Sequence, residues 1–248
     1  MKSLTHYIQE KLIIKKSKYN YFPQTKEELQ DIIKKRIKKE GNEANLNDID
    51  TSNITDMSEL FEYSKFNGDI SKWNVSNITD MSYLFSDSDF NGDISGWDVS
   101  NVTNMSAMFF GCEEFNCDIS NWDVSNVTNM ASMFYRCEEF DKDISNWDVS
   151  KVTNMAYMFY DCKKFNSNIY DWDVSNVTNM ANMLTWCESF NQDISKWDVS
   201  KVTNANEMFY GCKSFNKDIS NWDVSNVKNI KFIFVRCPIE EKYKPKFK

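Results

Sequence analysis

Apolar residues return along the chain with a regular long period. Seven phenylalanines each open one unit, and their spacing is 24 residues once and 25 thereafter. They are Phe66, Phe90, Phe115, Phe140, Phe165, Phe190 and Phe215. The unit is F-N-x-D-I-S-x-W-D-V-S-N-V-T-N-M-x-x-M-F-x-x-C-x-x. Because the Ile, Trp and Met positions recur in one register, stacked units would bury each column against its own copies.

This pattern predicts an α/β repeat fold, a right-handed leucine-rich-repeat-like solenoid of about eight turns over residues 42–239. The turns start near residues 42, 66, 90, 115, 140, 165, 190 and 215. Alternation in F-N-x-D-I-S predicts a very short strand, and W-D-V-S-N predicts a bend. The segment V-T-N-M-x-x-M-F places Met, Met and Phe at i, i+3 and i+4, which predicts one or two turns of helix.

Residues 1–41 are predicted to form a helical cap and leader. Thr25 and Glu28 make a capping box, and Gly41 marks the end of the helix. One apolar stripe follows the helical period, at Leu29, Ile32, Ile33 and Ile37. We expect this helix to cover the open end of the first turn, as terminal repeats require.

The two ends of the chain carry weaker signals. Residues 1–14 can form another amphipathic helix, with Leu4, Tyr7, Ile8 and Leu12 on one side. Residues 240–248 form a basic tail after Pro238, and we expect this tail to be frayed.

Composition narrows the classes of function. Aromatic residues make up 15% of the chain, with 8 Trp, which excludes a disordered polymer. Residues 1–48 carry a net charge of +4 and residues 49–248 carry −12, so the repeats are not expected to bind nucleic acid. No run is long enough for membrane insertion, and no signal peptide is evident, so a cytoplasmic location with reduced thiols is the expectation. A monomer is expected.

Catalytic and metal chemistry find little support. The single histidine, His6, lies outside the repeats, and no Ser/His/Asp or Cys/His arrangement can be built within them. Stacked aspartates such as Asp143 and Asp148 could bind calcium, but acceptance of backbone amides at a bend is favoured. The cysteine column, at 25-residue intervals, lacks the close pairs that zinc needs and predicts a ladder of small buried side chains. We therefore expect no cofactor, no metal and no enzymatic activity.

Candidate contact residues stand out where the repeat is irregular. In residues 165–189, Tyr170 replaces serine, Asn168 interrupts an aspartate column, and Trp186 stands where other units have Gly, Arg or Asp. Exposed aromatics can mark a contact patch, although ordinary drift in a repeat array explains them as well. A second column tolerates unrelated residues and is expected to be exposed. Its members proposed for partner contact are Cys117, Lys142, Gln192 and Lys217.

The repeat resembles that of the BspA-like leucine-rich-repeat surface protein family, over about residues 42–239. Members are bacterial surface proteins or lipoproteins, and similar repeats occur in phage and large-virus proteins. The resemblance implies a solenoid used for adhesion or protein binding without known catalysis. We predict a protein–protein interaction or scaffold module that uses one face of the solenoid. The alternative is a surface adhesin or a phage or virion structural component, which would place the chain at the cell surface or in a virion.

Overall fold

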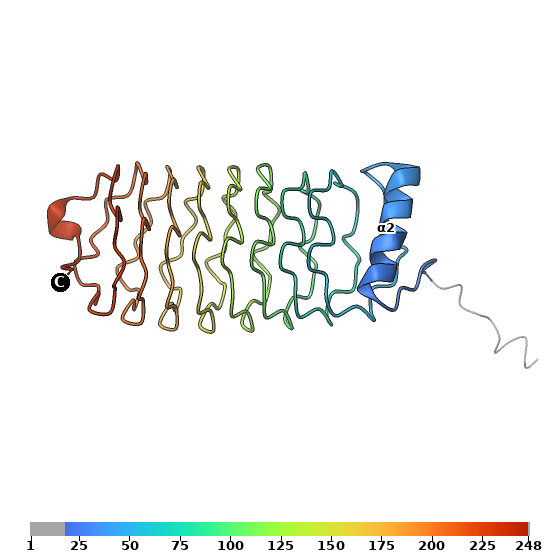
Figure 1. Ribbon diagram of the computed structural model, residues 1–248, viewed down its shortest axis with the longest axis horizontal. Helices are drawn as coiled ribbons and strands as arrows, with labels where there is room; N and C mark the ends of the chain where they lie inside the picture. The colour runs from blue at the N-terminus through green and yellow to red at the C-terminus, as the bar shows by residue number, and fades with distance from the viewer. Residues whose placement is uncertain (1–17, 248) are drawn as a thin grey trace, which may run out of the picture.

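The computed structural model describes residues 18–247 as a stack of similar turns with a helix across one end (Figure 1). Within these residues the only helices are α2, Lys26–Glu40, and the short 3-10 helix η1, Glu241–Tyr243. Between them the chain winds as a solenoid whose turns touch through isolated parallel bridges. The helix predicted within residues 1–14 lies outside the described residues.

One residue of each turn takes part in a continuous ladder of bridges. The ladder contains Asp56, Asp80, Asn104, Asn129, Asn154, Asn179, Asn204 and Asn229, which mark eight stacked turns. After the bridge, every second amide crosses to the next turn. Thus Phe134 N–H donates to the Met158 carbonyl at 2.9 Å, whereas Met133 N–H donates within its own turn to Met130 at 3.2 Å. In this segment the backbone is a series of tight bends. Its amides that do not bond within their own turn donate to the next turn of the solenoid.

The predicted helix over V-T-N-M-x-x-M-F is wrong. Two positions in each turn have a left-handed backbone, such as Ser132 at φ 57° and Arg136 at φ 58°. A left-handed residue ends a helix, and here its own amide donates to the neighbouring turn, as Ser132 N–H does to the Ala156 carbonyl at 2.8 Å. The predicted strand in F-N-x-D-I-S is also absent from the described residues, where only isolated bridges occur. The repeat is therefore built from turns, and the expected α/β class is corrected accordingly.

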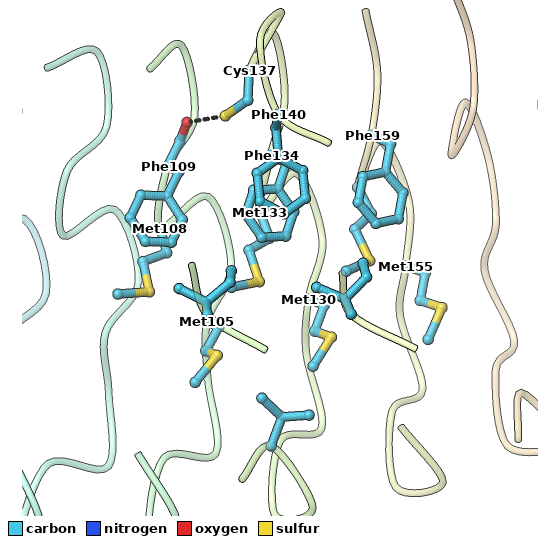
Figure 2. Close-up of a cluster of buried hydrophobic side chains, with 14 of the residues drawn as sticks. Met105, Met108, Phe109, Met130, Met133, Phe134, Cys137, Phe140, Met155 and Phe159 are labelled. Atoms are coloured by element: carbon cyan, nitrogen blue, oxygen red, sulfur yellow. Dashed lines mark hydrogen bonds between the residues drawn. The ribbon is translucent and has the colours of Figure 1, made fainter. Parts of the chain in front are cut away.

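The predicted apolar columns are confirmed as the core (Figure 2). Phe134 is fully buried, and its ring stacks between Phe109 and Phe159, with centroids 5.7 and 5.6 Å away. The Trp column is also buried, and each of its indole N–H groups donates a hydrogen bond to a backbone carbonyl. Trp147 Nε1, for example, donates to the Ile119 carbonyl of the preceding turn at 3.2 Å. Each column therefore continues from turn to turn without leaving an unsatisfied indole.

The cysteine column forms a ladder of thiols. Cys137 is fully buried, and its Sγ donates to the carbonyl of Phe109 in the preceding turn at 3.0 Å (Figure 2). Burial raises the pKa of Cys137 and Cys162 well above the ordinary thiol value. The described cysteines are all free, and the column is buried from Cys112 to Cys212. The predicted ladder of small buried side chains is confirmed.

Aspartates hold the bends, as predicted. Asp143 Oδ1 accepts the Ser145 amide at 2.9 Å, and Asp148 Oδ1 accepts the Ser150 amide at 3.0 Å. These bonds stabilise the ionised form and hold the pKa of Asp143 below its ordinary value. Asn168 fills the same role, because its Oδ1 accepts the backbone amide two residues on at 3.0 Å.

The cap helix α2 packs on the first turn. Thr25 caps its start by accepting the Glu28 amide at 3.3 Å, and Gly41 N–H bonds to the Ile37 carbonyl at its end. Leu29 and Ile33 are buried, while Ile32 and Ile37 are partly buried against the core. The stripe therefore seals the first turn with two of its four residues.

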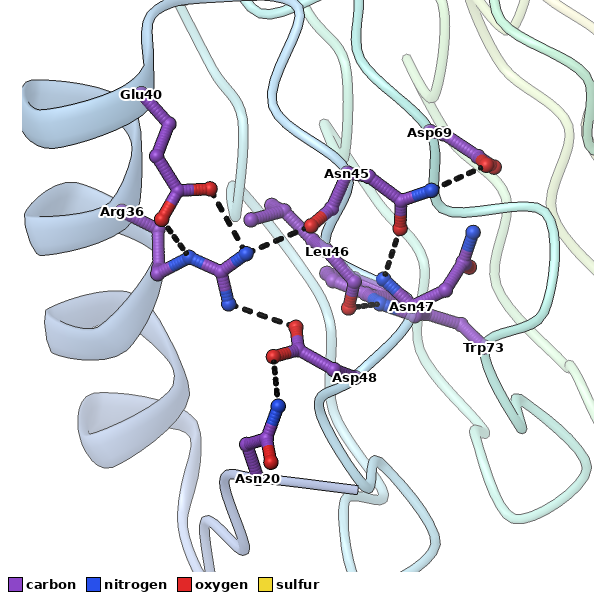
Figure 3. A network of polar contacts seen from close by, with 9 residues as sticks. All are labelled: Asn20, Arg36, Glu40, Asn45, Leu46, Asn47, Asp48, Asp69 and Trp73. Atoms are coloured by element: carbon purple, nitrogen blue, oxygen red, sulfur yellow. Dashed lines mark hydrogen bonds and ion pairs between the residues drawn. The ribbon is translucent and has the colours of Figure 1, made fainter. Parts of the chain in front are cut away.

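A buried arginine also holds α2 against the first turn (Figure 3). Arg36 pairs with Glu40 of its own helix and with Asp48 of the first turn, each at 2.7 Å, and it donates to the Asn45 carbonyl at 2.8 Å. The hydrogen bond to Glu40 raises the pKa of Arg36 further. The apolar stripe gave no sign of this contact, which ties α2 to the solenoid through a charged side chain.

The basic tail is ordered against the last turn, so the prediction of a frayed end is wrong for residues 240–247. The Ile219 amide donates to the Tyr243 carbonyl at 3.0 Å, which extends the contact between turns beyond residue 239. Tyr243 and Phe247 pack against the core, and Ile239 is buried. Apolar residues between the lysines anchor the tail.

Candidate binding surface

The predicted contact residues fall into separate groups. Tyr170 lies on a bend, where the Lys196 ammonium sits 4.2 Å from its ring centroid. Trp186 instead lies on the segment between the Met and Cys columns and contacts Tyr210. Within residues 18–247, the hydrogen bonds and ring contacts of Tyr170 and Trp186 involve different residues. The irregular unit 165–189 therefore contributes to two surfaces rather than to one patch.

The column of Cys117, Lys142, Gln192 and Lys217 is half-buried, not exposed as predicted. Its member Ser167 is buried, and the Ser167 hydroxyl accepts the Ile144 amide at 3.3 Å. Gln192 donates to the Asn166 carbonyl at 2.8 Å. Burial also raises the pKa of the Cys117 thiol. Members of this column as different as Ser167 and Gln192 each bond to the backbone of a neighbouring turn.

Trp186 occupies one of the left-handed positions, with φ 61°. Its ring lies against Gly211 in the next turn, where an added Cβ would come within 2.4 Å of the indole. The ring centroid is 5.2 Å from that of Tyr210, and Arg236 lies over both rings. The glycine of one turn therefore makes room for the tryptophan of the turn before.

Trp186 and Tyr210 lie on the same segment of the turn as a run of stacked rings that the sequence analysis missed, and Thr185 stands between the two groups in the column. The aromatic strip, as we define it, consists of Phe110, Tyr135, Tyr157, Tyr160, Trp186 and Tyr210. Phe110 stacks on Tyr135 with centroids 4.3 Å apart, and Tyr135 stacks on Tyr160 at 4.6 Å, both with rings 5° from parallel. Tyr157 leans on Tyr160 at 6.0 Å and is 40% exposed. The remaining members of the strip are half-buried.

The signal for the strip is present in the repeat. Aromatics recur at the position after the last Phe of M-x-x-M-F, at Phe110, Tyr135, Tyr160 and Tyr210. In a helix that position would lie away from the two methionines, which hid its continuity. In the observed turn it faces the same column of the neighbouring turns, so that the side chains stack outside the core.

Two carboxylates flank the centre of the strip. Burial raises the pKa of Tyr160, with further contributions from Tyr135, Asp161 and Glu207. Burial also raises the pKa of Asp161. Within residues 18–247, neither Asp161 nor Glu207 forms an ion pair or a side-chain hydrogen bond. The strip therefore combines apolar rings with two carboxylates that form no direct ion pair, although the nearby cations of Lys163 and Arg136 lower the pKa of Asp161 in part.

Ion pairs between turns border the strip. Lys163 pairs with Glu138 of the preceding turn at 2.6 Å, and Arg136 pairs with Glu113 at 3.0 Å. Lys213 pairs with Glu188 in the same manner at 2.7 Å. These pairs are exposed or half-exposed and contribute little stability. These ion pairs neutralise the charged side chains along the border of the strip.

Hollows on the described surface are shallow and open. One, of about 240 Å³, is lined by acidic residues that include Asp87 and Glu113 beside Gly111. No three His, Cys, Asp or Glu side chains in the described part of the chain are grouped to hold a metal ion. No helix within residues 18–247 has the length and apolar run needed to cross a membrane.

Comparisons with known proteins give a family and two distant structures. No match was found among the curated proteins. A leucine-rich repeat protein from Eubacterium ventriosum is similar at 13% identity and a TM-score of 0.32, over 77% of this chain and 57% of that chain. The plant peptide hormone receptor RGFR1 in complex with RGF2 aligns at 8% identity and a TM-score of 0.17, over 70% of this chain and 40% of that one. The chain thus spans little more than half the length of the first of these structures.

A family model matches most of the solenoid in two overlapping copies, over residues 28–145 and 132–243. Two adjacent matches are what a uniform repeat produces when it is longer than the model. The matched region includes most of α2, all eight bridged turns and η1. The chain therefore belongs to the family described as "Mycoplasma protein of unknown function, DUF285".

Proposed function

We propose that the protein is a non-enzymatic binding module that recognises a protein partner through the aromatic strip. The observation that supports this proposal is the position of the strip, where Tyr135 and Tyr160 stack on the outer side of the core. The core columns are fully buried, whereas these two rings are half-buried and keep part of their surface exposed. That surface is available to a partner.

The strip suits protein recognition for physical reasons. Tyrosine and tryptophan offer large contact areas at a low cost in side-chain entropy, and they are enriched among interface residues that dominate binding energy. Stacking holds Tyr135 between its neighbours before a partner arrives, which lowers the entropy lost on binding. The solenoid backbone beneath is tied by hydrogen bonds in every turn.

We further propose that the partner presents cationic side chains among its apolar ones. Asp161 and Glu207 lie beside the rings and form no ion pair within residues 18–247, although the cations of Lys163 and Arg136 act on Asp161 without direct contact. A lysine or arginine of the partner could pair with Asp161 and also lie over the exposed ring of Tyr157. Such a contact would neutralise a carboxylate that burial already disfavours in its charged form.

A second candidate is adhesion at a cell surface or a structural role in a virion. It is supported by the repeat motif, whose F-N-x-D-I-S-x-W-D-V-S form resembles BspA-like surface proteins. The proposal predicts that the protein is found on the outside of its cell or in particles. Protease treatment of intact cells, followed by immunoblotting, would degrade an external protein and spare an internal one.

The main proposal is tested with two matched variants of the full chain. The strip variant carries Tyr157→Ser and Trp186→Gly, since serine and glycine already occupy those columns in other turns. The control is Tyr170→Ser, which restores the usual residue of its column on the bend. Proteins retained from the native cell extract are compared by quantitative mass spectrometry.

We expect one partner to be retained equally by the parent and the Tyr170→Ser control and to fall at least about tenfold with the strip variant. Circular dichroism and a thermal melt establish that both variants are folded. A partner retained equally by all three proteins would show that the strip is not the binding surface. Loss with Tyr170→Ser alone would move the site to the bend.

A further inference from the structure

The last turn of the solenoid has a row of backbone donors without acceptors. In the turn before it, the amides of Glu207 and Phe209 donate to the Lys231 and Ile233 carbonyls at 2.9 and 3.0 Å. The corresponding amides of the last turn have no hydrogen-bond partner within residues 18–247. They belong to Ile230, Phe232, Phe234 and Arg236. The ladder that joins all other turns therefore ends in four adjacent free N–H groups.

Apolar side chains surround these donors. Phe232 is 61% exposed and Val235 is 40% exposed, whereas Ile230 and Phe234 are half-buried. Beside them is a hollow of about 690 Å³ between the last turn and the tail, lined by Ile233, Phe234, Phe247 and several tail residues. An exposed row of donors with apolar neighbours is the feature by which a sheet edge takes up another chain.

The charge of this end is opposite to that of the repeats. Residues 228–247 carry six basic and two acidic side chains, although residues 49–248 together have a net charge of −12. Lys228, Lys231 and Arg236 are exposed around the donor row. A chain that docks here meets a positive field, which favours an acidic segment.

A second copy of this chain does not fit the donor row. Two such ends would meet donor to donor, because the ladder runs in one direction, so a symmetric pair cannot form its hydrogen bonds. The complementary carbonyls of the first turn lie at the end that α2 crosses, with Lys26 bonded to Asp56 and Ser58 (Figure 1). A helix is about 10 Å wide with its side chains and keeps a second solenoid away from that end.

We infer that the C-terminal end of the solenoid binds an acidic, non-helical segment of another protein, which accepts the four free amides and adds one turn to the ladder. This site adjoins the aromatic strip at Arg236, whose guanidinium lies over Trp186 and Tyr210, but it uses the backbone donors of the last turn rather than the rings. The segment would offer carbonyls at alternate residues, as each turn does for the one before it. Its apolar residues would cover Phe232 and Phe234, and its carboxylates would face Lys231 and Arg236.

The chain itself supplies the design of a probe. Residues 51–64, T-S-N-I-T-D-M-S-E-L-F-E-Y-S, have the backbone pattern of a turn and carry three acidic residues and no basic one. A fluorescent synthetic peptide with this sequence is titrated with the full-length protein, and anisotropy is recorded. A scrambled peptide of the same composition serves as the control for net charge.

We expect saturable binding of the first peptide and at least about tenfold weaker binding of the scrambled one, because only the former places carbonyls and apolar groups in register. Hydrogen exchange of residues 228–237, followed by mass spectrometry, should slow when the peptide is present. Exchange in residues 128–137 should not change, since those amides are already bonded within the ladder.

Two charge variants test the position of the site. Lys231→Glu lies beside the donor row, and Lys72→Glu makes the same change at an exposed position near the other end. Lys231→Glu should weaken the peptide about tenfold and Lys72→Glu less than about twofold. Absence of binding, equal binding of the scrambled peptide, or equal effects of the two variants would overturn the proposal. So would protection outside residues 228–247. None of these outcomes bears on the aromatic strip.

Discussion

The bends and the aromatic strip occupy different segments of the same turn and differ in how much their residue types vary from turn to turn. At the bends nearly every turn repeats an Asp or Asn followed two positions later by a serine, and the carboxylate or amide oxygen accepts the serine N–H, as in Asp143. Along the strip the column of Tyr135 holds Glu, Ser, Phe, Tyr, Thr or Val in the eight turns. One segment is nearly invariant between turns, whereas the other varies.

The difference follows from which groups satisfy the backbone. At a bend the Ser145 amide donates its hydrogen bond to the side chain of Asp143, so a substitution of Asp143 removes the acceptor of that amide. Along the strip the amides bond to backbone carbonyls of the next turn, as Arg136 N–H does to Tyr160 O at 2.7 Å. Within residues 18–247 the rings of Tyr135 and Tyr160 form no hydrogen bond to the backbone, whereas Thr185 of the same column donates to the Glu207 carbonyl. The rings are therefore available for binding.

The largest loss of stability is expected from substitutions in the core beneath both surfaces. Phe134→Ala should lower the free energy of unfolding by about 3–5 kcal/mol, because the ring is fully buried between Phe109 and Phe159. Lys142→Ala, on a half-buried exterior column, should cost within about 0.5 kcal/mol. Denaturant melts of both variants beside the parent measure the difference, and equal costs would contradict the assignment of core and exterior.

Acid should weaken the bends together. Hydrogen bonds from serine lower the pKa of Asp93, Asp143 and Asp148 in the folded chain, so the folded state binds fewer protons than the unfolded chain near the ordinary pKa of 3.8. The resulting stabilisation is fully present above that value and is lost as the pH falls through the lower folded pKa. The melting temperature should therefore fall steadily between pH 5 and about pH 2. A melting temperature that is constant over this range would count against the account of the bends.

A single bend tests the role of the side-chain acceptor. Asp143→Ala should destabilise the protein by about 0.5–1 kcal/mol, since the exposed Ser145 amide can turn to water for part of its bond. Asp143→Asn should cost less, because Asn168 fills the same role in the next turn. Chemical melts at pH 7 compare the two. A larger cost for asparagine than for alanine would show that the charge, rather than the hydrogen bond, matters.

The strip should contribute least to stability. Tyr157→Ser removes a ring that is 40% exposed and makes only tilted contacts with Tyr160 and Tyr135, so the free energy of unfolding should change by about 0.5 kcal/mol or less. Calorimetry of this variant beside Asp143→Ala sharpens the comparison between the two surfaces. A cost above about 2 kcal/mol would make Tyr157 part of the scaffold and weaken the case for a binding role.

Much of the architecture can be predicted from the spacing of residues, because identical columns can only stack on one another. The buried Met, Phe, Ile and Trp columns, the bend aspartates and the cap helix with Leu29 and Ile33 follow in this way. The local backbone does not, since M-x-x-M-F has the same apolar spacing in a helix and in these turns. Left-handed residues such as Ser132 give no signal, because glycine stands at that type of position in only two turns, at Gly111 and Gly211.

The candidate sites were harder to predict from the sequence for the same reason. Trp186 was identified as unusual, but its link to Tyr210 depends on the left-handed backbone that lets the ring lie over Gly211. Tyr135 and Tyr160 belong to an apparently ordinary column until the turn geometry places that column outside the core. The contact of Arg36 with Asp48 likewise depends on how α2 crosses the first turn (Figure 3).

The binding role of the strip can be tested most directly by photo-crosslinking in the native cell. A photoreactive phenylalanine derivative is introduced in place of Tyr157 on the strip or in place of Tyr170 on the bend, in otherwise identical full chains. Irradiation should join the strip derivative to one discrete protein, identified by mass spectrometry, and the bend derivative should give no such product. Crosslinking from the bend alone, or from neither position in cells that contain the folded protein, would contradict the account.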